Sequence, residues 1–309
     1  MPGMRVCVCT AGQHPEDARI LHRQIRALLD AGHQVTYLAP FRAHNVTPWP
    51  GLTPVDVPRL SDRFRALRLV RRAFNEHAPH ADLVLLHDPE LGVVAPRRVP
   101  VVMDGRSTRR AAGTVDSPTL TPVPPTPLRS PDDRRVVHLG RLSLDGGAEE
   151  IIELADLLSG QGVATELIGP ADEAVRPLLR DAQRRGVLRW YGYVPNDRAL
   201  RIISGASAGL SFPRTARGEA PTRVLEYMAH GVPVISTPEP STAFLLEEIG
   251  SGLIVRDVAH AHAAVTRLLG NASERADLAK RGHEAAGRRF DWADEAPRFV
   301  AGLEALARA

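Results

Sequence analysis

Short apolar runs alternate along the chain with longer segments in which apolar residues recur every three or four positions. The runs are typical of buried strands, and the segments are typical of amphipathic helices. The pattern predicts strands at 5–10, 34–39, 82–86, 99–103, 135–139, 164–168, 188–191, 208–212, 232–236 and 253–255, and helices at 19–31, 62–77, 259–269, 273–289 and 292–307.

The order of these elements predicts an α/β protein. The chain opens with strand, helix and strand, a unit that joins parallel strands by a right-handed crossover. The regular alternation after residue 135 predicts a doubly wound parallel sheet. Six prolines between 117 and 131 exclude a helix or a central strand there. Segment 117–134 is therefore predicted to link a first domain, 1–116, to a second domain, 135–290.

The stretch 208–238 carries the strongest functional pattern. A strand leads through a loop rich in Arg and Pro into a helix that is predicted to begin at Pro221, where a missing N–H group costs nothing. In a parallel sheet such a helix begins at the carboxyl ends of the strands, and its N–H groups and dipole attract phosphate. Arg223 adds a positive charge, and Glu226 can accept hydrogen bonds from a ribose diol. We expect a nucleoside diphosphate site here; a plain helix with a solvated Glu226 is the alternative.

Residues 221–237, PTRVLEYMAHGVPVIST, resemble the donor-binding signature of glycosyltransferase family 4. The resemblance implies a retaining enzyme of GT-B architecture, with two Rossmann-like domains facing across a cleft and a shortened N-terminal domain. It also implies a final helix, 291–309, that packs back toward the N-terminal domain. Donor-binding roles follow for Thr222, Arg223, Val224 and Glu226.

Two further parts of the donor site follow from the same resemblance. Many family members carry an earlier Glu, a contact to the transferred sugar, eight positions before the Glu of the signature. Here the candidate catalytic residue, Glu219, lies seven positions before Glu226. Tyr193 and Val194 match a Gly-x-Val segment whose backbone contacts the nucleotide base.

Gly140 and Arg141 close the predicted strand 135–139 in the letters HLGR. In the family this Gly-Arg pair begins the donor-phosphate site, and an Arg fork can bind phosphate through two hydrogen bonds. A second basic residue follows five positions later in the family, where this chain has Gly146. The alternatives for the missing charge are Arg214, Arg217 and Arg223.

Polar residues also follow the strands of the first half, where an active site forms in parallel α/β sheets. His87 and Asp88 begin the letters HDPEL, and Asp104 follows strand 99–103. HDPEL matches a subset of the family, which implies that His87 is a catalytic residue contacting the donor sugar; a structural role at the strand end is the alternative. The subset has Asp-x-His-Glu at the second position, whereas Gly-Arg-Ser follows Asp104 here.

The loop after the first strand carries Gly12, His14 and Asp17. It resembles a loop that lies at the cleft in the same subset, which implies acceptor or cleft roles for these residues together with Asp88 and Asp104. Without the resemblance, Asp17 is a helix N-cap. Both interpretations of Asp17 stay open at this point.

The composition narrows the class of partner. The chain has 39 basic and 36 acidic residues, a net charge of +3, so nothing indicates a nucleic acid partner. Segment 62–77 predicts a basic amphipathic helix, which indicates a weak contact with a membrane surface, a site for a phosphorylated acceptor, or a solvated face. Cys7 and Cys9 lie on one face of a strand and are predicted to be thiols of a reducing cytoplasm. We expect a cytoplasmic protein without a membrane span or signal peptide.

The sequence has no Asp-x-Asp motif and no His pair with the spacing of a metal site. It therefore predicts no metal and no cofactor, with a nucleoside diphosphate sugar as co-substrate. The resulting expectation is transfer of a sugar to an unidentified small-molecule or glycan acceptor bound in the cleft. The alternatives are a nucleotide-sugar-binding partner subunit without catalysis and a GT-B sugar-nucleotide epimerase.

Overall fold

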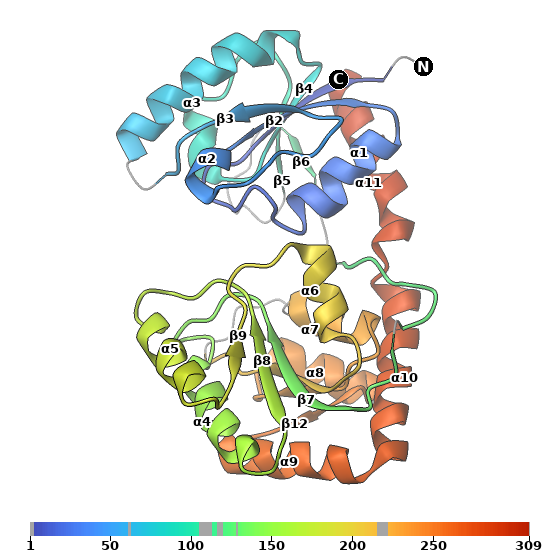
Figure 1. Ribbon diagram of the computed structural model, residues 1–309. Coiled ribbons are helices and arrows are strands. Elements are labelled where there is room, and N and C mark those ends of the chain that lie inside the picture. The colour runs from blue at the N-terminus through green and yellow to red at the C-terminus, as the bar shows by residue number, and fades with distance from the viewer. Residues whose placement is uncertain are drawn as a thin grey trace. The chain divides into compact units, whose positions relative to one another are not determined.

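The computed structural model describes residues 3–60, 63–104, 113–115, 120–127, 129–214 and 222–308, without the side chains of 63–65 and 113–115. The chain forms two compact units (Figure 1). The first contains Met1–Pro118 and Ala293–Ala309, and the second contains Thr119–Trp292. The boundary near residue 118 falls inside the segment 117–134 that the prolines predict to be a linker.

The first unit is built on a parallel sheet of six described strands in the order β3-β2-β1-β4-β5-β6. The strand at the start of the chain lies inside the sheet, as expected when crossovers carry the chain to both sides of it. The strands are β1 (Arg5–Cys9), β2 (Gln34–Ala39), β3 (Thr53–Asp56), β4 (Leu83–Leu86), β5 (Val101–Asp104) and β6 (Gly113–Val115). The helices are α1 (Arg26–Asp30), α2 (Phe41–His44), α3 (Arg63–His77) and α11 (Trp292–Arg308), which belongs to this unit from Ala293 on.

Strand β3 is missing from the prediction for a physical reason. It is four residues long, contains Pro54, and pairs with β2 at the edge of the described sheet. Proline is tolerated at such an edge because one side of the strand makes no ladder hydrogen bonds. Its side chains are exposed or half-buried, so it lacks the apolar run by which the other strands are recognised.

The predicted helix 19–31 is helical but not a single α-helix. Residues Ile20–Ile25 form a π-helical turn, and α1 follows directly. The N–H group of Gln24 donates to the carbonyl of Arg19, five residues earlier, at 3.0 Å. Helical periodicity in the sequence does not distinguish this wider turn from an α-helical one. Such turns often mark functional sites.

The second unit is built on a parallel sheet with the order β12-β11-β10-β7-β8-β9 among its described residues. The predicted doubly wound arrangement is confirmed. The strands are β7 (Asp133–Leu139), β8 (Ala164–Ile168), β9 (Arg189–Trp190), β10 (Ala206–Ser211), β11 (Val234–Ser236) and β12 (Gly252–Ile254). The helices are α4 (Ala148–Ser159), α5 (Arg176–Arg184), α6 (Asn196–Ile203), α7 (Thr222–Ala229), α8 (Pro240–Ile249), α9 (Val258–Gly270) and α10 (Ala272–Arg289). Pro221, the predicted start of α7, lies outside the described residues.

Apolar side chains fill both faces of this second sheet. Successive residues of a strand point to opposite faces, and Val136 and Val137 show this directly. Val136 packs in a buried cluster with residues of α4, α5 and α9, whereas Val137 packs with residues of α6, α7, α8 and α10. Figure 1 shows α4 and α5 on one side of β8, with α6 and α7 on the other. The sheet is buried on both sides, which explains its continuous apolar strands.

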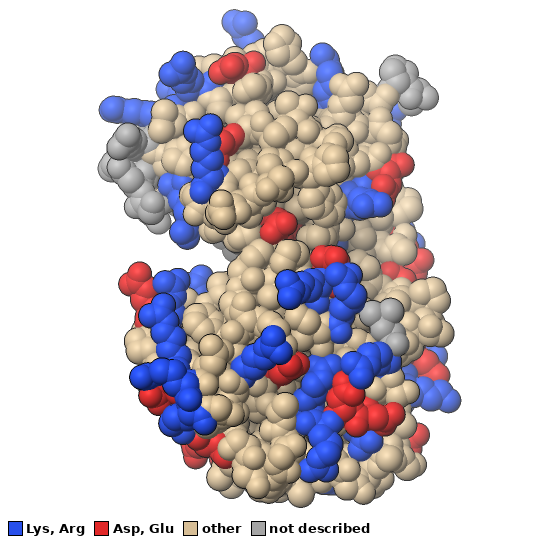
Figure 2. All heavy atoms as spheres, in the orientation of Figure 1, with Lys and Arg blue, Asp and Glu red and all other residues tan. Residues whose placement is uncertain are grey.

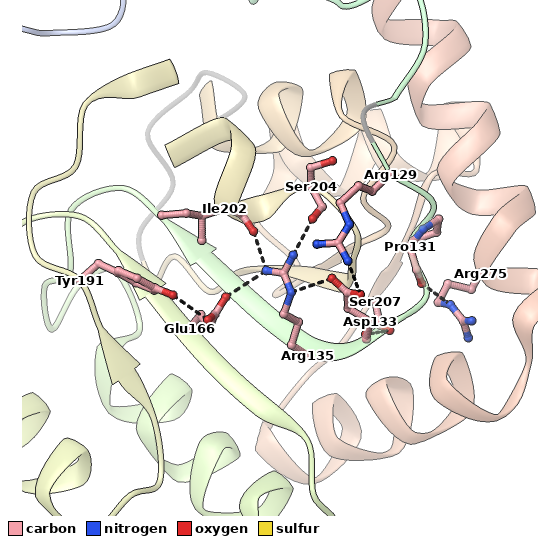
Figure 3. Close-up of polar contacts among 10 residues, drawn as sticks. All are labelled: Arg129, Pro131, Asp133, Arg135, Glu166, Tyr191, Ile202, Ser204, Ser207 and Arg275. Carbon is pink, nitrogen blue, oxygen red and sulfur yellow. Dashed lines mark hydrogen bonds and ion pairs between the residues drawn. The ribbon is translucent and has the colours of Figure 1, made fainter. Parts of the chain in front are cut away.

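Arg135 ties helix α6 to the sheet (Figure 3). Its guanidinium donates to the carbonyls of Ile202 and Ser204, each at 2.5 Å, at the C-terminal end of α6. The same group pairs with Asp133 and Glu166, each at 3.0 Å. A cation at a helix C-terminus satisfies carbonyls that lack a partner within the helix and complements the helix dipole. Arg135 therefore orients α6 against β7 and β8.

A contact between His33 and Glu304 connects the last helix to the rest of the first unit. The Nδ1 atom of His33 accepts a hydrogen bond from the Met4 N–H group at 3.0 Å. The Nε2 atom of His33 lies 3.4 Å from the Glu304 carboxylate on α11. Together these contacts join the chain before β1, the turn before β2 and α11.

Cys7 and Cys9 are free and buried in β1. Burial raises the pKa of the Cys7 thiol to about 12, so it stays protonated at neutral pH. Among the residues that the structure describes, none of the helices combines the length and apolar character needed to cross a bilayer.

We expect Arg135→Met to lower the free energy of unfolding by about 3 kcal/mol, because it leaves Glu166 and the two carbonyls at the end of α6 without their partner. Arg129→Met is the matched control, because Arg129 also pairs with Asp133 but has a 58% exposed side chain. Exposed pairs contribute little. Urea denaturation followed by circular dichroism measures both variants, and equal stability of the two would contradict the role given to Arg135.

Candidate functional site

Glycines follow three neighbouring strands at the carboxyl edge of the second sheet: Gly140 after β7, Gly169 after β8 and Gly192 after β9. Their φ angles are +115°, +143° and +67°. A Cβ atom on Gly169 would lie 2.0 Å from the Gly140 carbonyl oxygen, and the Gly169 N–H group donates to the Gly192 carbonyl at 2.8 Å. The edge is therefore closely packed backbone that a ligand can approach. Sequence reasoning missed Gly169, although it directly follows a predicted strand.

Arg223 lies over this edge. Its guanidinium atoms are 3.6–3.7 Å from the position of a Cβ on Gly140, and its Nη1 atom is 3.3 Å from Nε2 of His138. The Nδ1 atom of His138 is 3.2 Å from the Leu210 carbonyl. Burial and the charge of Arg223 hold the pKa of His138 well below its ordinary value. A neutral imidazole and a guanidinium thus meet beside the predicted phosphate site.

Helix α7 is fixed by Tyr227, which sequence reasoning did not select. A Cβ atom on Gly209 of β10 would lie 2.5 Å from the Tyr227 ring, so the ring fits there because Gly209 has no side chain. The Tyr227 hydroxyl accepts the Leu139 N–H group at 2.7 Å and donates toward the Leu210 carbonyl at 3.3 Å. Arg223 lies one helical turn before Tyr227, and this contact places it beside Gly140.

The structure separates the three alternatives for the second phosphate-binding charge. Arg214 pairs with Glu149 at 2.9 Å and with Glu150 at 2.7 Å in the first turn of α4. Arg217 lies outside the described residues. Arg223 is the alternative whose guanidinium is described next to Gly140. Arg141 itself has a 72% exposed side chain and pairs with Asp172 at 2.6 Å.

The remaining predicted donor residues differ in exposure. Glu226 is buried on α7 with 5% of its surface exposed, and Val224 is fully buried in the core. Thr222 and Val194 are half-buried, and Tyr193 is 38% exposed. The Val224 side chain therefore packs in the protein, whereas Tyr193 is accessible. Glu219 lies outside the described residues, so its catalytic role stays a prediction.

In the first unit, His87 and Asp104 meet at the ends of neighbouring strands β4 and β5. The Nδ1 atom of His87 is 3.1 Å from Oδ2 of Asp104. The same oxygen accepts Nε2 of Gln24 at 3.1 Å and forms an ion pair with Nη1 of Arg19. Burial and the charge of Arg19 hold the pKa of His87 well below its ordinary value.

The π-helical turn explains why Arg19 and Gln24 reach one carboxylate oxygen. In an α-helix, residues five apart are separated by about 140° around the axis and point in different directions. The turn at Ile20–Ile25 is wider, and Gln24 bonds back to the fifth residue before it. Both side chains therefore contact Asp104. Sequence reasoning placed Arg19 only at the start of helix 19–31 and missed Gln24.

This cluster offers acceptor atoms to a ligand. The Nδ1 proton of His87 points at the Asp104 carboxylate, so the Nε2 atom of the neutral ring can only accept a hydrogen bond. Nε2 of His87 and Oδ1 of Asp104 are buried and have no hydrogen-bond partner in the part of the chain that the structure describes. Arg19 compensates the charge of Asp104, so the carboxylate orients His87 without making it strongly basic. The arrangement suits a hydroxyl donor.

The other predicted residues of the first unit hold the loop after β1. The Oδ2 atom of Asp88 accepts from the Thr10 hydroxyl at 2.9 Å and from the Ala11 and Gly12 N–H groups at 2.7 and 3.1 Å. A Cβ atom on Gly12 would lie 2.6 Å from Oδ1 of Asp88. These contacts give Asp88 and Gly12 structural roles, and their acceptor roles stay predictions.

Asp17 and His14 also have contacts inside the first unit. The Oδ1 atom of Asp17 accepts the N–H groups of Arg19 and Ile20 at 3.0 and 3.1 Å, which is the predicted capping contact. The ring centroid of His14 is 4.4 Å from that of His44. Burial, followed by the neighbouring His44, lowers the pKa of His14 to about 4. A cleft role for either residue stays a prediction.

Helix α3 is confirmed as amphipathic. Val70 and Phe74 are buried, whereas Arg68, Leu69, Arg71 and Arg72 are exposed. On the face drawn in Figure 2, basic and acidic side chains are mixed over the second unit. The predicted membrane contact of α3 is untested by the structure.

Proteins of known class resemble this chain in sequence. A family described as glycosyl transferase-like matches residues 149–301. WcaL of Escherichia coli, a putative colanic acid biosynthesis glycosyltransferase, is 30% identical over 181 residues, which cover 54% of this chain and 43% of WcaL. The chain thus matches less than half the length of this curated relative.

Solved structures resemble it in fold. Sucrose-phosphate synthase from Thermosynechococcus elongatus has a TM-score of 0.70 at 16% identity, covering 97% of this chain and 98% of its own. HepE from Anabaena, solved with UDP and glucose, has a TM-score of 0.67 at 14% identity, covering 98% and 100%. Residues 149–301 thus match a glycosyl transferase-like family, and the chain as a whole shares the fold of these solved structures. The predicted α/β class and GT-B fold are confirmed; membership of family 4 within the GT-B glycosyltransferases stays a prediction.

We expect His87→Gln to reduce the loss of stability on acidification. The folded protein keeps His87 neutral, whereas an unfolded His takes up a proton near pH 6.5. The unfolded state therefore binds more protons below that pH, and stability falls as pH falls. The variant should have a slope between pH 6.5 and 5 that is smaller by up to about 1.4 kcal/mol per pH unit. Urea denaturation across this range measures it, and an unchanged slope would contradict a neutral, buried His87.

Proposed function

We propose that the protein is a retaining, metal-independent glycosyltransferase that moves a sugar from a nucleoside diphosphate sugar to an acceptor held by the first unit. The observation that carries the proposal is the guanidinium of Arg223 lying over Gly140 at the carboxyl edge of the second sheet. Ligands of open α/β sheets bind at this edge. A cation against accessible backbone is suited to a phosphate group.

The surroundings of Arg223 suit the remainder of a nucleotide. Arg141 follows Gly140 and brings a second guanidinium to the end of β7, where two cations can neutralise a diphosphate. Glu226 lies on the same helix as Arg223 and offers a carboxylate for the ribose hydroxyls. HepE, which shares the fold, has been solved with UDP and glucose, and this supports a nucleotide-sugar donor.

The proposed reaction breaks the bond between the anomeric carbon and the diphosphate oxygen and forms a bond from an acceptor oxygen to that carbon. Negative charge develops on the departing diphosphate. Guanidinium groups held in place before the reaction stabilise that charge, as preorganised groups do in other transferases. We propose that Arg141 and Arg223 serve this purpose in place of a metal ion.

We propose retention of the anomeric configuration because of the properties of His87 in the first unit. An inverting displacement needs a base that removes the proton of the acceptor hydroxyl. His87 is a poor base because it is buried and because Arg19 already compensates its partner Asp104. We therefore assign His87 to accepting a hydroxyl of the donor sugar, while the departing phosphate takes the acceptor proton. This order of steps agrees with the retaining reaction that the resemblance to family 4 implies.

Thermal unfolding with UDP, GDP, ADP or TDP tests the donor site. A nucleotide at 100 times its dissociation constant stabilises the folded state by about 2.7 kcal/mol, which raises Tm by several degrees. We expect one nucleotide to do so, and Arg223→Ala and Glu226→Ala to remove most of the shift. Arg185→Ala is the matched control, because Arg185 pairs with Asp156 and Asp181 away from this edge.

The Arg214→Ala variant tests whether Arg214 supplies the second phosphate-binding charge. We expect this variant to keep the rise in Tm that the nucleotide causes. Absence of a shift with all four nucleotides in the wild-type protein would contradict the proposed function. Incubation with the matching nucleotide sugar then separates a transferase from a non-catalytic partner subunit or an epimerase. The anomeric configuration of the product, read by NMR, tests retention.

A further inference from the structure

We propose that His138 is a positioning residue that holds Arg223 in place for the donor diphosphate. The inference rests on the proposed function and adds a residue that neither the sequence pattern nor the comparisons assign. His138 lies in β7, two residues before Gly140, and is fully buried. It does not line the edge itself, so it acts through Arg223.

Besides a backbone hydrogen bond with Arg141 that raises the pKa of His138, the ring has two partners that favour one tautomer. The Leu210 carbonyl can only accept a hydrogen bond, so Nδ1 of His138, 3.2 Å away, carries the proton. The guanidinium of Arg223 can only donate, so Nε2, 3.3 Å from Nη1, presents a lone pair. The contact therefore requires a neutral imidazole. Burial and the positive charge of Arg223 favour that neutral form, because an imidazolium here would place two buried cations together.

The hydrogen bond sets where the positive charge stands. Arg has several rotatable bonds, and an unanchored guanidinium would lose much conformational freedom when a phosphate binds. The bond to His138 holds one corner of the guanidinium next to Gly140 before any ligand is present. The Leu210 carbonyl that orients His138 also contacts the Tyr227 hydroxyl at 3.3 Å. The same carbonyl thus helps to fix the orientation of the His138 ring and the position of the helix that carries Arg223.

This geometry limits the ligand chemistry that His138 influences. A ligand group that reaches Arg223 at Gly140 must be anionic, and in a nucleoside diphosphate that group is a phosphate. In this proposal the nucleoside part binds elsewhere along the edge, so its affinity should not depend on His138. The effect of His138 should therefore appear with nucleoside diphosphates and be absent with the corresponding nucleosides.

A double-mutant cycle tests the inference. Isothermal titration calorimetry would measure UDP, GDP, ADP and TDP, with the matching nucleosides as controls, on the wild type, His138→Leu, Arg223→Ala and the double variant. We expect His138→Leu to weaken binding of the preferred diphosphate about ten-fold in the wild type and by less than two-fold in the Arg223→Ala background. Such non-additivity is the mark of two residues that act through one contact. Nucleoside binding should change in none of the variants.

The His138→Gln variant is a control that distinguishes loss of the hydrogen bond from a simple folding defect. Its amide can donate to Leu210 and accept from Arg223, so it should recover most of the diphosphate affinity, whereas a mere packing role would not distinguish it from Leu. Nitrogen NMR gives a readout that needs no ligand: the proton should reside on Nδ1, and the Nε2 resonance should move in Arg223→Ala. Equal losses in both backgrounds would overturn the positioning role alone. No binding by the wild type would overturn the proposed function as well.

Discussion

The packing of Tyr227 against Gly209 is the contact on which the candidate donor site depends. Because Gly209 has no side chain, the aromatic ring lies directly on β10, and its hydroxyl reaches the backbone of β7 and β10. Any larger residue at 209 would push helix α7 away from the sheet. Arg223 stands one turn before Tyr227, and a shift of the helix would carry its guanidinium away from Gly140. A cation at the carboxyl edge is thus a consequence of apolar packing deeper in the core.

A neutral, buried histidine stands at a strand end in each unit, and the two differ in what their proton faces. The Nδ1–H group of His87 donates a hydrogen bond to Asp104, whose charge is already compensated by Arg19. The Nε2 atom of His87 can therefore accept a hydrogen bond from a ligand hydroxyl. The Nδ1–H group of His138 donates a hydrogen bond to the Leu210 carbonyl, and its Nε2 atom accepts one from the Arg223 guanidinium. In both, burial and then a neighbouring arginine lower the pKa and keep the imidazole neutral, and the direction of the ring follows from the partner of Nδ1. The same chemistry leaves a buried acceptor atom at His87 in the first unit and a contact with Arg223 at His138 in the second.

The sequence predicts most strands because they contain runs of mainly apolar residues, most of them buried, as at Gln34–Ala39 and Ala164–Ile168. It misses the three-residue strand β6 and also β3, whose side chains remain exposed or half-buried, and it cannot distinguish the π-helical turn at Ile20–Ile25 from an α-helix. Polar residues at strand ends were correctly expected to gather, and His87 and Asp104 do meet. The supporting residues could not be found in the same way. His138 and Tyr227 acquire their roles only because β7 and β10 are neighbours, and a strand order in which residues about 70 apart pair cannot be read from local pattern.

The replacement of a basic residue by Gly146 shows how the site and the fold constrain one another. A Cβ atom on Gly147 would lie 2.1 Å from the Phe212 carbonyl, and one on Gly146 would lie 2.9 Å from the Ser143 hydroxyl. The turn before α4 is therefore tight, and it brings the start of that helix against the end of β10. A side chain at 146 would have to displace the Ser143 hydroxyl, which accepts the Gly146 N–H group at 3.0 Å. The charge that the family resemblance places in the turn has instead a counterpart on α7, at Arg223. In the function that we propose, donor binding depends on the position of α7, so a core residue such as Tyr227 or His138 would control the phosphate site without touching the ligand.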